Sequence, residues 1–323
     1  PIAPDVNFRQ VARITAGFTG ADLENLLNEA AILAVRDGRK LITMADINEG
    51  INKVVMGPAK KSRLVTEPDK RITAYHEAGH AIIGSLLKYC DPIHEVTIIP
   101  RGQAAGYTMS RPDNDNSHVS RQELLDDITM GLGGRVAEEL VIKNYCTGAS
   151  GDIKMITDKA RSMVTEWGMS DRIGPIYYGS NGEIFVGRDY QTEKGYSEEI
   201  AGVIDEEVRA IIESCHQCAT QILTENLNVL HNMARVLVER ETIHTEEVDM
   251  LVKGATVEEV FAYMDKADNA EQGSAEVKPV AKQPTADNAT ETVDNATQTA
   301  TTEEPKQADN GDADKQDDQD NNK

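Results

Sequence analysis

The sequence predicts a mainly helical protein that contains one small β-sheet and ends in a disordered acidic tail. Apolar residues recur at intervals of three and four through most of the chain up to Gly254, which is the period of an amphipathic helix. Hydrophobic residues make up 39% of the chain but aromatic residues only 4%, which favours helices packed through aliphatic side chains. Two short segments, near residues 96 and 108, have the composition of strands.

Residues 1–60 are predicted to form a small helical unit. A short helix over residues 7–14 precedes a longer helix that Thr19 caps and Gly38 ends. Thr43 caps a third helix, which stops at the sequence Met-Gly-Pro before a short basic linker. The chain contains no G-x-x-x-x-G-K-[ST] phosphate loop, so this unit cannot hydrolyse ATP alone.

The next predicted helix contains the motif H-E-x-x-H. Thr66 and Asp69 suit a cap at its start, and apolar residues continue at helical spacing on both sides of the motif. His76 and His80 lie one turn apart on such a helix, so both imidazoles can reach one metal ion. Glu77 follows the first histidine and is a candidate general base.

Strands are predicted on both sides of a glycine-containing turn. Residues 94–99 form the first and residues 107–110 the second. Further along, residues 176–178 and 184–186 are short apolar pieces on either side of an Asn-Gly pair, which is typical of a β-hairpin.

The helix that Ser120 caps contains three glycines, at positions 131, 133 and 134. A glycine inside a helix costs about 1 kcal/mol, so this cluster indicates the close approach of another backbone. The H-E-x-x-H helix, which carries Gly79, is the expected neighbour. A glycine-rich turn at residues 147–152 then leads into a further helix that ends at Gly168.

The C-terminal part of the chain is predicted to be helical and then disordered. Residues 197–225 and 227–239 form a helical pair, and Thr245 caps a last helix that stops at Gly254. Residues 265–323 contain 15 acidic and 6 basic residues and no aromatic residue. Such a segment buries too little apolar surface to offset its ordering entropy, so we expect it to be disordered.

The overall charge is unfavourable for nucleic acid, whose phosphates require clustered Lys and Arg, because the net charge is −22. Four cysteines in 323 residues do not make a disulfide framework, and a reducing compartment is expected. No apolar run approaches the ~20 residues that span a bilayer. The first residue is Pro1 rather than Met, so we expect the chain to begin inside a longer protein.

A catalytic zinc site needs a third protein ligand besides His76 and His80. The metzincin pattern is excluded, because Ile83 and Leu86 occupy the places of its Gly and His. Four acidic residues remain as candidates: Glu95, Glu138, Glu139 and Asp152. Glu95 falls in a predicted strand rather than on a helix, which disfavours it. Asp152 is favoured by its place in the first turn of a helix behind a flexible loop, although aspartates at that position are also common as caps.

Four segments of the sequence resemble the peptidase domain of FtsH-type ATP-dependent zinc proteases. These are residues 73–81 (TAYHEAGHA), 96–102 (VTIIPRG), 133–139 (GGRVAEE) and 147–150 (TGAS). Residues 17–31, with GFTGADL and NEAA, resemble the small helical lid of the AAA ATPase module that precedes that domain in the family. The resemblance implies a lid over residues 1–60, a zinc metallopeptidase domain over 61–264 and a disordered acidic tail over 265–323.

The resemblance also implies the chemistry and the setting. In this family the third zinc ligand is an aspartate after the Gly-Ala-Ser turn, which corresponds to Asp152. Zn²⁺ is then held by His76, His80 and Asp152, with Glu77 as general base, whereas ATP and Mg²⁺ belong to an ATPase core absent from this sequence. The expected assembly is a homo-hexamer, anchored in the cell membrane by missing N-terminal segments, with this portion on the cytoplasmic side.

The expected activity is hydrolysis of unfolded proteins, including membrane proteins, delivered by the adjoining AAA unfoldase. Such a chain could bind as an added strand beside residues 96–99 or 107–110. The alternative is a non-proteolytic module that only assembles the ring of a AAA protein. A scaffold has no need for a general base, so Glu77 argues for the protease.

Overall fold

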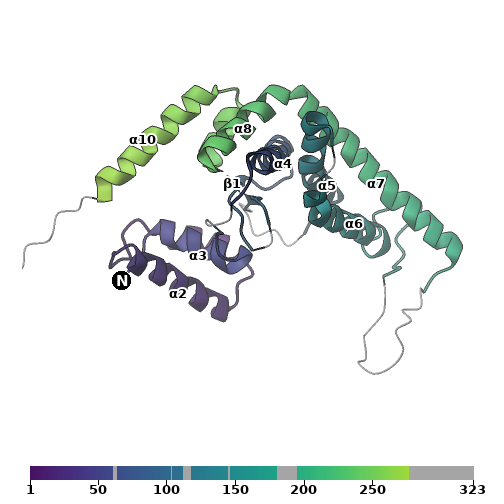
Figure 1. The fold of residues 1–323 in the computed structure, drawn as a ribbon. Helices are drawn as coiled ribbons and strands as arrows, with labels where there is room; N and C mark the ends of the chain where they lie inside the picture. The colour runs from purple at the N-terminus through teal and green to yellow at the C-terminus, as the bar shows by residue number, and fades with distance from the viewer. Residues whose placement is uncertain (61–63, 103, 112–117, 145, 180–194, 276–323) are drawn as a thin grey trace, which may run out of the picture. The chain divides into compact units, whose positions relative to one another are not determined.

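The computed structural model describes residues 1–60, 64–102, 104–111, 118–144, 146–179 and 195–275. Their secondary structure is helical apart from one three-stranded antiparallel sheet, in agreement with the predicted fold class (Figure 1). Within this part of the chain, none of the helices combines the length and apolar content needed to cross a membrane.

The N-terminal unit consists of α1 (Phe8–Ile14), α2 (Gly20–Arg36) and α3 (Met44–Met56). Thr19 and Thr43 begin α2 and α3 with reciprocal capping boxes, as the sequence predicts. This unit has a small hydrophobic core of its own, distinct from the core of the following residues, and its buried members are Val6, Leu26, Ala30, Ile47 and Ile51.

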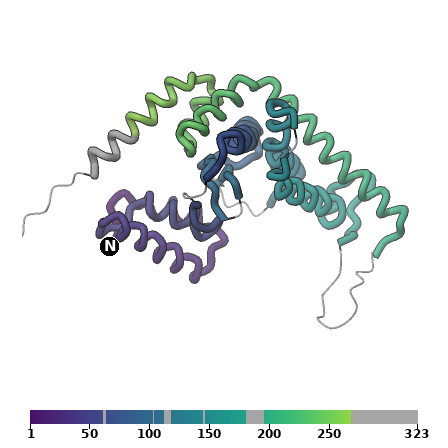
Figure 2. Tube along the Cα trace, viewed as in Figure 1, coloured from purple at the N-terminus to yellow at the C-terminus, as the bar shows by residue number. Residues whose placement is uncertain are grey.

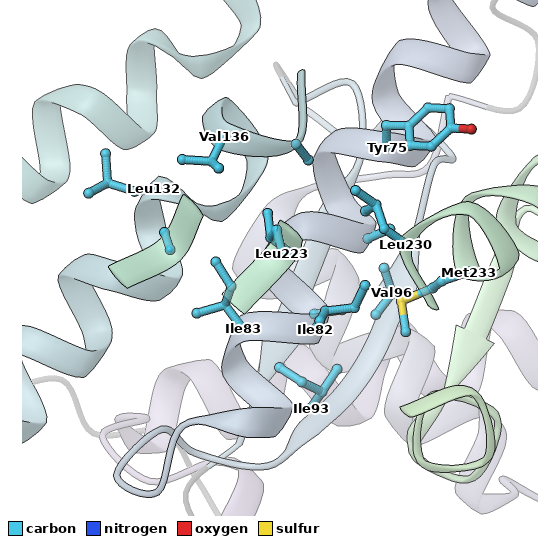
Figure 3. Close-up of a cluster of buried hydrophobic side chains, with 14 of the residues drawn as sticks. Tyr75, Ile82, Ile83, Ile93, Val96, Leu132, Val136, Leu223, Leu230 and Met233 are labelled. Atoms are coloured by element: carbon cyan, nitrogen blue, oxygen red, sulfur yellow. The ribbon is translucent and has the colours of Figure 1, made fainter. Parts of the chain in front are cut away.

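Helix α4 (Glu67–Leu86) carries the H-E-x-x-H motif and lies at the centre of the second, larger core. Thr66 caps its first turn by accepting a hydrogen bond from the backbone N–H of Asp69 at 3.3 Å. Its middle is buried between α5 (Arg121–Ala137) and α8 (Leu227–Arg240). Figure 3 shows side chains from α4, the sheet and the C-terminal helices meeting in this core, among them Ile82, Ile83, Ile93, Leu223 and Met233.

The remaining helices complete the second unit. A π-turn, η1 (Glu138–Ile142), continues α5, and a short 3-10 turn, η2 (Thr147–Ala149), leads into α6 (Ser150–Thr165). The long α7 (Glu198–Glu225) is followed by α8, α9 (Thr245–Val252) and α10 (Val257–Ala275), a path that Figure 2 traces. Helix α10 extends beyond residue 265, where the disordered tail was expected to begin. The rest of that expected tail, residues 276–323, lies outside the described residues.

The sheet contains β1 (Ile93–Thr97), β2 (Tyr107–Ser110) and β3 (Thr242–His244) in the order β2-β1-β3. The first two strands were predicted, but the third was not, because three residues are too few to show an alternating pattern. The hairpin predicted at 176–186 is not observed where it can be checked, since residues 176–178 form no strand. Its second half lies outside the described residues.

Candidate metal centre

Helices α4 and α6 bring three potential metal ligands together. Within the described residues, one group of His, Cys, Asp and Glu side chains could hold a metal ion, and it consists of His76, His80 and Asp152. One ligand atom from each lies within 4.8 Å of the others. The Nε2 atoms of the two histidines are 3.1 Å apart. Oδ2 of Asp152 lies 3.2 Å from Nε2 of His76 and 3.8 Å from Nε2 of His80.

The other ring nitrogen of each histidine has a hydrogen-bond acceptor. Nδ1 of His76 lies 2.8 Å from Oε1 of Glu138, and Nδ1 of His80 lies 2.8 Å from the carbonyl oxygen of Met130. A carbonyl oxygen can only accept, and the buried carboxylate is a strong acceptor, so each Nδ1 carries the hydrogen and donates. Both Nε2 lone pairs then face Asp152, which is the arrangement that orients histidines toward a metal ion.

This donor set fits a zinc ion. Two facing nitrogen lone pairs and a carboxylate oxygen repel one another unless a positive charge lies among them. Three protein ligands of the types His, His and Asp match a catalytic zinc site, in which a fourth position stays open. The residues present therefore suit the group that the sequence predicts.

The pKa values of these residues show that the site stabilises a positive charge. Burial lowers the pKa of His76, but hydrogen bonds to Asp152 and Glu138 outweigh burial and raise it to about 10. Burial raises the pKa of Asp152, but its interactions with His76 and His80 outweigh burial and hold it well below the ordinary value. The local field thus favours a cation beside Asp152.

Glu77 lines the same cavity as the three ligands and is almost fully buried. Burial raises the pKa of its carboxyl above the ordinary value, which suits a group that must accept and return a proton. The Thr108 hydroxyl on β2 lies 2.8 Å from Oε2 of Glu77 and donates to it. Oε1 faces Gly106, where an added Cβ would lie 3.0 Å from it.

Glycines on α5 let the two central helices touch through their backbones. A Cβ at Gly79 would collide with the carbonyl oxygen of Gly133. A Cβ at Gly133 would lie 2.6 Å from the carbonyl oxygen of Gly79. A Cβ at Gly134 would come within 2.5 Å of the His76 imidazole. The glycine cluster therefore allows the close approach that the sequence predicts, and it also leaves room for a ligand.

The cavity at this centre has a volume of about 630 Å³. Its lining includes the metal ligands and the turn before β2, and Met130 and Met155 add apolar surface. A cavity of this size with a few convergent polar groups is typical of a site that binds a substrate.

Comparison with known proteins agrees with this geometry. The sequence matches "Peptidase family M41" over residues 63–251 and "AAA+ lid domain" over residues 5–49. The chain belongs to peptidase family M41. All three potential ligands and Glu77 fall inside the M41 match, and α1, α2 and the start of α3 fall inside the lid match.

Curated relatives of this M41 chain carry the name "ATP-dependent zinc metalloprotease FtsH". The protein named FtsH 1 from Thermoanaerobacter sp. (strain X514) is 51% identical over 261 residues, which cover 80% of this chain and 43% of the relative. The protein from Veillonella parvula is 50% identical over 260 residues, covering 80% and 40%. The chain thus spans about two fifths of the length of these relatives.

The other candidate ligands of the M41 chain have different partners. Glu138 is buried beside His76 and holds its ring, while Glu139 lies 3.3 Å from His216 on α7. Glu95 on β1 accepts a hydrogen bond from the Tyr107 hydroxyl and is not among the grouped ligands.

Three supporting contacts were not predicted from the sequence. They are the hydrogen bond from His76 to Glu138, the bond from His80 to the Met130 carbonyl and the bond from Thr108 to Glu77. Glu138, the partner in the first, lies where α5 ends and the π-turn begins. Its place after the glycine cluster was the sequence signal that pointed to Glu138. That signal indicated a metal ligand, whereas Glu138 is the hydrogen-bond partner of the ligand His76.

Proposed function

We propose that this chain is the peptidase portion of a zinc-dependent endopeptidase that hydrolyses unfolded proteins. The observation that carries the proposal is the convergence of His76, His80 and Asp152 beside the buried Glu77 in one cavity. When bound there, zinc supplies a positive charge that polarises the scissile carbonyl and makes a water molecule more acidic.

The protein side of the reaction follows from the hydrogen bonds. Glu138 and the Met130 carbonyl hold the two imidazoles with Nε2 toward the cavity, and Asp152 adds a carboxylate oxygen. Oε2 of Glu77 is engaged by Thr108, so Oε1 is the atom available to take a proton from water and deliver it to the leaving amine nitrogen.

The sheet restricts where an extended substrate can add as a strand. β1 is paired with β2 on one side and with β3 on the other, so no free strand edge remains beside Val96 and Thr97. β2 has a strand partner on one side only among the described residues, so its outer edge supports strand addition. A proline introduced within Tyr107–Ser110 should raise KM for peptides, and unchanged kinetics would rule out this docking mode.

The larger assembly is part of the same proposal. The lid match over residues 5–49 and the names of the relatives support an adjoining AAA unfoldase that uses ATP and Mg²⁺. We infer a homo-hexamer in the cell membrane, with this portion on the cytoplasmic side, that receives unfolded and membrane proteins. Nucleic acid is not among the inferred partners, because the chain carries a net charge of −22.

Casein cleavage measured together with zinc content tests the peptidase. Glu77→Gln should retain zinc and lose nearly all cleavage, because the amide cannot take a proton. Asp152→Ala should lose both. Cleavage by the Glu77→Gln variant at the wild-type rate would contradict the mechanism and favour a non-proteolytic scaffold. Full zinc affinity in Asp152→Ala would require a different third ligand.

A further inference from the structure

A shallow groove continues from the metal centre along one face of α6. It has a volume of about 460 Å³, and the residues that define it include Gly151, Met155, Asp158, Ser162 and Trp167. The first four recur at intervals of three and four, so they lie on one face of the helix. The groove therefore begins beside Asp152 and runs toward the C-terminal end of α6.

The groove and the metal-centred cavity adjoin each other along α6. Gly151 and Met155 line both of them. An added Cβ at Gly151 would meet nothing within 4 Å, so the surface at this shared residue is open. A chain that leaves the scissile position therefore has the groove beside it.

Both ends of the groove present apolar surface to solvent, Met155 near the metal-centred cavity and Trp167 at the far end. Trp167 is 48% exposed and Met155 is 47% exposed. A helix rises ~1.5 Å per residue, so Gly151 and Ser162 are about 17 Å apart along α6. An extended chain advances ~3.3 Å per residue, so this distance corresponds to about five substrate residues.

The charges at the junction are paired. Asp127 lines the metal-centred cavity, Lys159 lines the groove, and the two form an ion pair. Lys154 and Asp158 are paired at 3.7 Å. The passage therefore carries no net charge from these four residues, which favours an apolar occupant over a charged one.

We propose that this groove is a remote substrate subsite that takes an aromatic or long aliphatic side chain about five residues from the scissile bond. The inference rests on the proposed peptidase function and adds a preference away from the cleaved bond. The occupant is an extended segment of the substrate polypeptide, because the groove opens from the catalytic cavity. Trp167 supplies a flat apolar surface on which such a side chain can pack.

Two pairs of fluorogenic peptides test the subsite on the full chain. Within a pair the peptides are identical except for Leu or Gly, placed five residues after the scissile bond in one pair and five residues before it in the other. In the pair whose variable residue lies at Trp167, kcat/KM should be about tenfold higher for the Leu peptide than for the Gly peptide, as expected for burying one apolar side chain. Trp167→Ala should abolish this difference, and Trp167→Phe should retain most of it.

Tyr263→Ala on α10 is the matched control, because Tyr263 is also an exposed aromatic residue, at 40%. It should leave the difference between Leu and Gly unchanged. Loss of activity on both peptides to the same extent in Trp167→Ala would show a purely structural role and overturn the subsite. If the wild type cleaves none of the four peptides, the proposed function fails. If it cleaves the Leu and Gly peptides equally in both pairs, only the subsite is refuted.

Binding can also be followed without cleavage, because Trp167 is the only tryptophan in the chain. In the Glu77→Gln variant, the Leu peptide of the discriminating pair should shift Trp167 emission to shorter wavelength, since burial removes water from the indole. The Gly peptide should cause a smaller shift. Identical emission with both peptides would overturn the proposal.

Discussion

The His76 imidazole occupies space that any side chain at position 134 would fill. We expect Gly134→Ala to displace this ring, because the added Cβ would lie within 2.6 Å of three of its atoms. Zinc affinity should fall at least tenfold, the size of effect seen when ligand orientation is disturbed. Zinc titration followed by calorimetry measures the loss.

Gly202→Ala on α7 is the control for this substitution. A Cβ at Gly202 would meet nothing within 4 Å, so the alanine should preserve zinc affinity and stabilise the helix by up to about 1 kcal/mol. Equal zinc affinity in the two variants would contradict the steric role of Gly134.

Thr108 determines which Glu77 oxygen faces the cavity. In Thr108→Val the hydrogen bond to Oε2 is lost while the shape of the side chain is retained. We expect kcat for a short peptide to fall by about tenfold to a hundredfold, the equivalent of a hydrogen bond to a charged group, with zinc content unchanged. Thr108→Ser should restore most of the rate, and a Ser variant as slow as Val would indicate a packing effect instead.

At the scale of elements, the start of α3 depends on one buried carboxylate. Asp46 completes the capping box with Thr43 and accepts hydrogen bonds from both terminal nitrogens of Arg39. Asp46→Ala should destabilise the N-terminal unit by about 1–3 kcal/mol, measured as faster amide exchange in α2 and α3. Asp37→Ala is the control, because Asp37 also contacts Arg39 but is 51% exposed, and it should cost little.

The same carboxylate gives this unit a pH dependence. Burial raises the pKa of Asp46, but hydrogen bonds from Arg39 and Thr43 outweigh burial and lower it from the ordinary 3.8 to about 2. Because the folded-state pKa is the lower one, its contribution is fully present above pH 3.8 and is lost as the pH falls toward 2. Helicity of the wild type and of Asp46→Ala should therefore converge over this range. A constant difference would contradict the assignment.

At the scale of the whole molecule, the metal centre connects helices that are distant in the sequence. His76 and His80 belong to α4 and Asp152 to α6, so only the folded chain brings all three together. Zinc at about a thousandfold excess over Kd should stabilise the fold by about 4 kcal/mol and raise the Tm by roughly 10 °C.

A thermal melt with and without zinc measures this effect, and EDTA should reverse it. Asp152→Asn keeps the size of the side chain but removes its charge, and it should respond to zinc much less than the wild type. An equal rise in Tm for both chains would show that zinc acts elsewhere.

Local sequence was sufficient to predict α1 to α9, but not α10 (Val257–Ala275), and it pointed to most of the candidate site residues. Caps at Thr19, Thr43, Thr66 and Ser120 mark helix starts because each depends on residues within three positions. The spacing of His76 and His80 places both on one helical face for the same reason. Asp152 could only be favoured among four acidic residues by its position, and the family resemblance was needed to choose it.

The contacts that complete the centre depend on the tertiary structure. The β3 strand pairs with β1 across about 150 residues of sequence, and Thr108 reaches Glu77 only because the sheet packs beside α4. Glu138 was predicted as a rival ligand, but the packing of α5 against α4 brings it to Nδ1 of His76 instead. The sequence alone placed His76, Glu77 and His80 together on one helix, since residue type and helical spacing are local properties. The fold decided their orientation, because hydrogen bonds between distant segments form only after α4, α5 and α6 pack together.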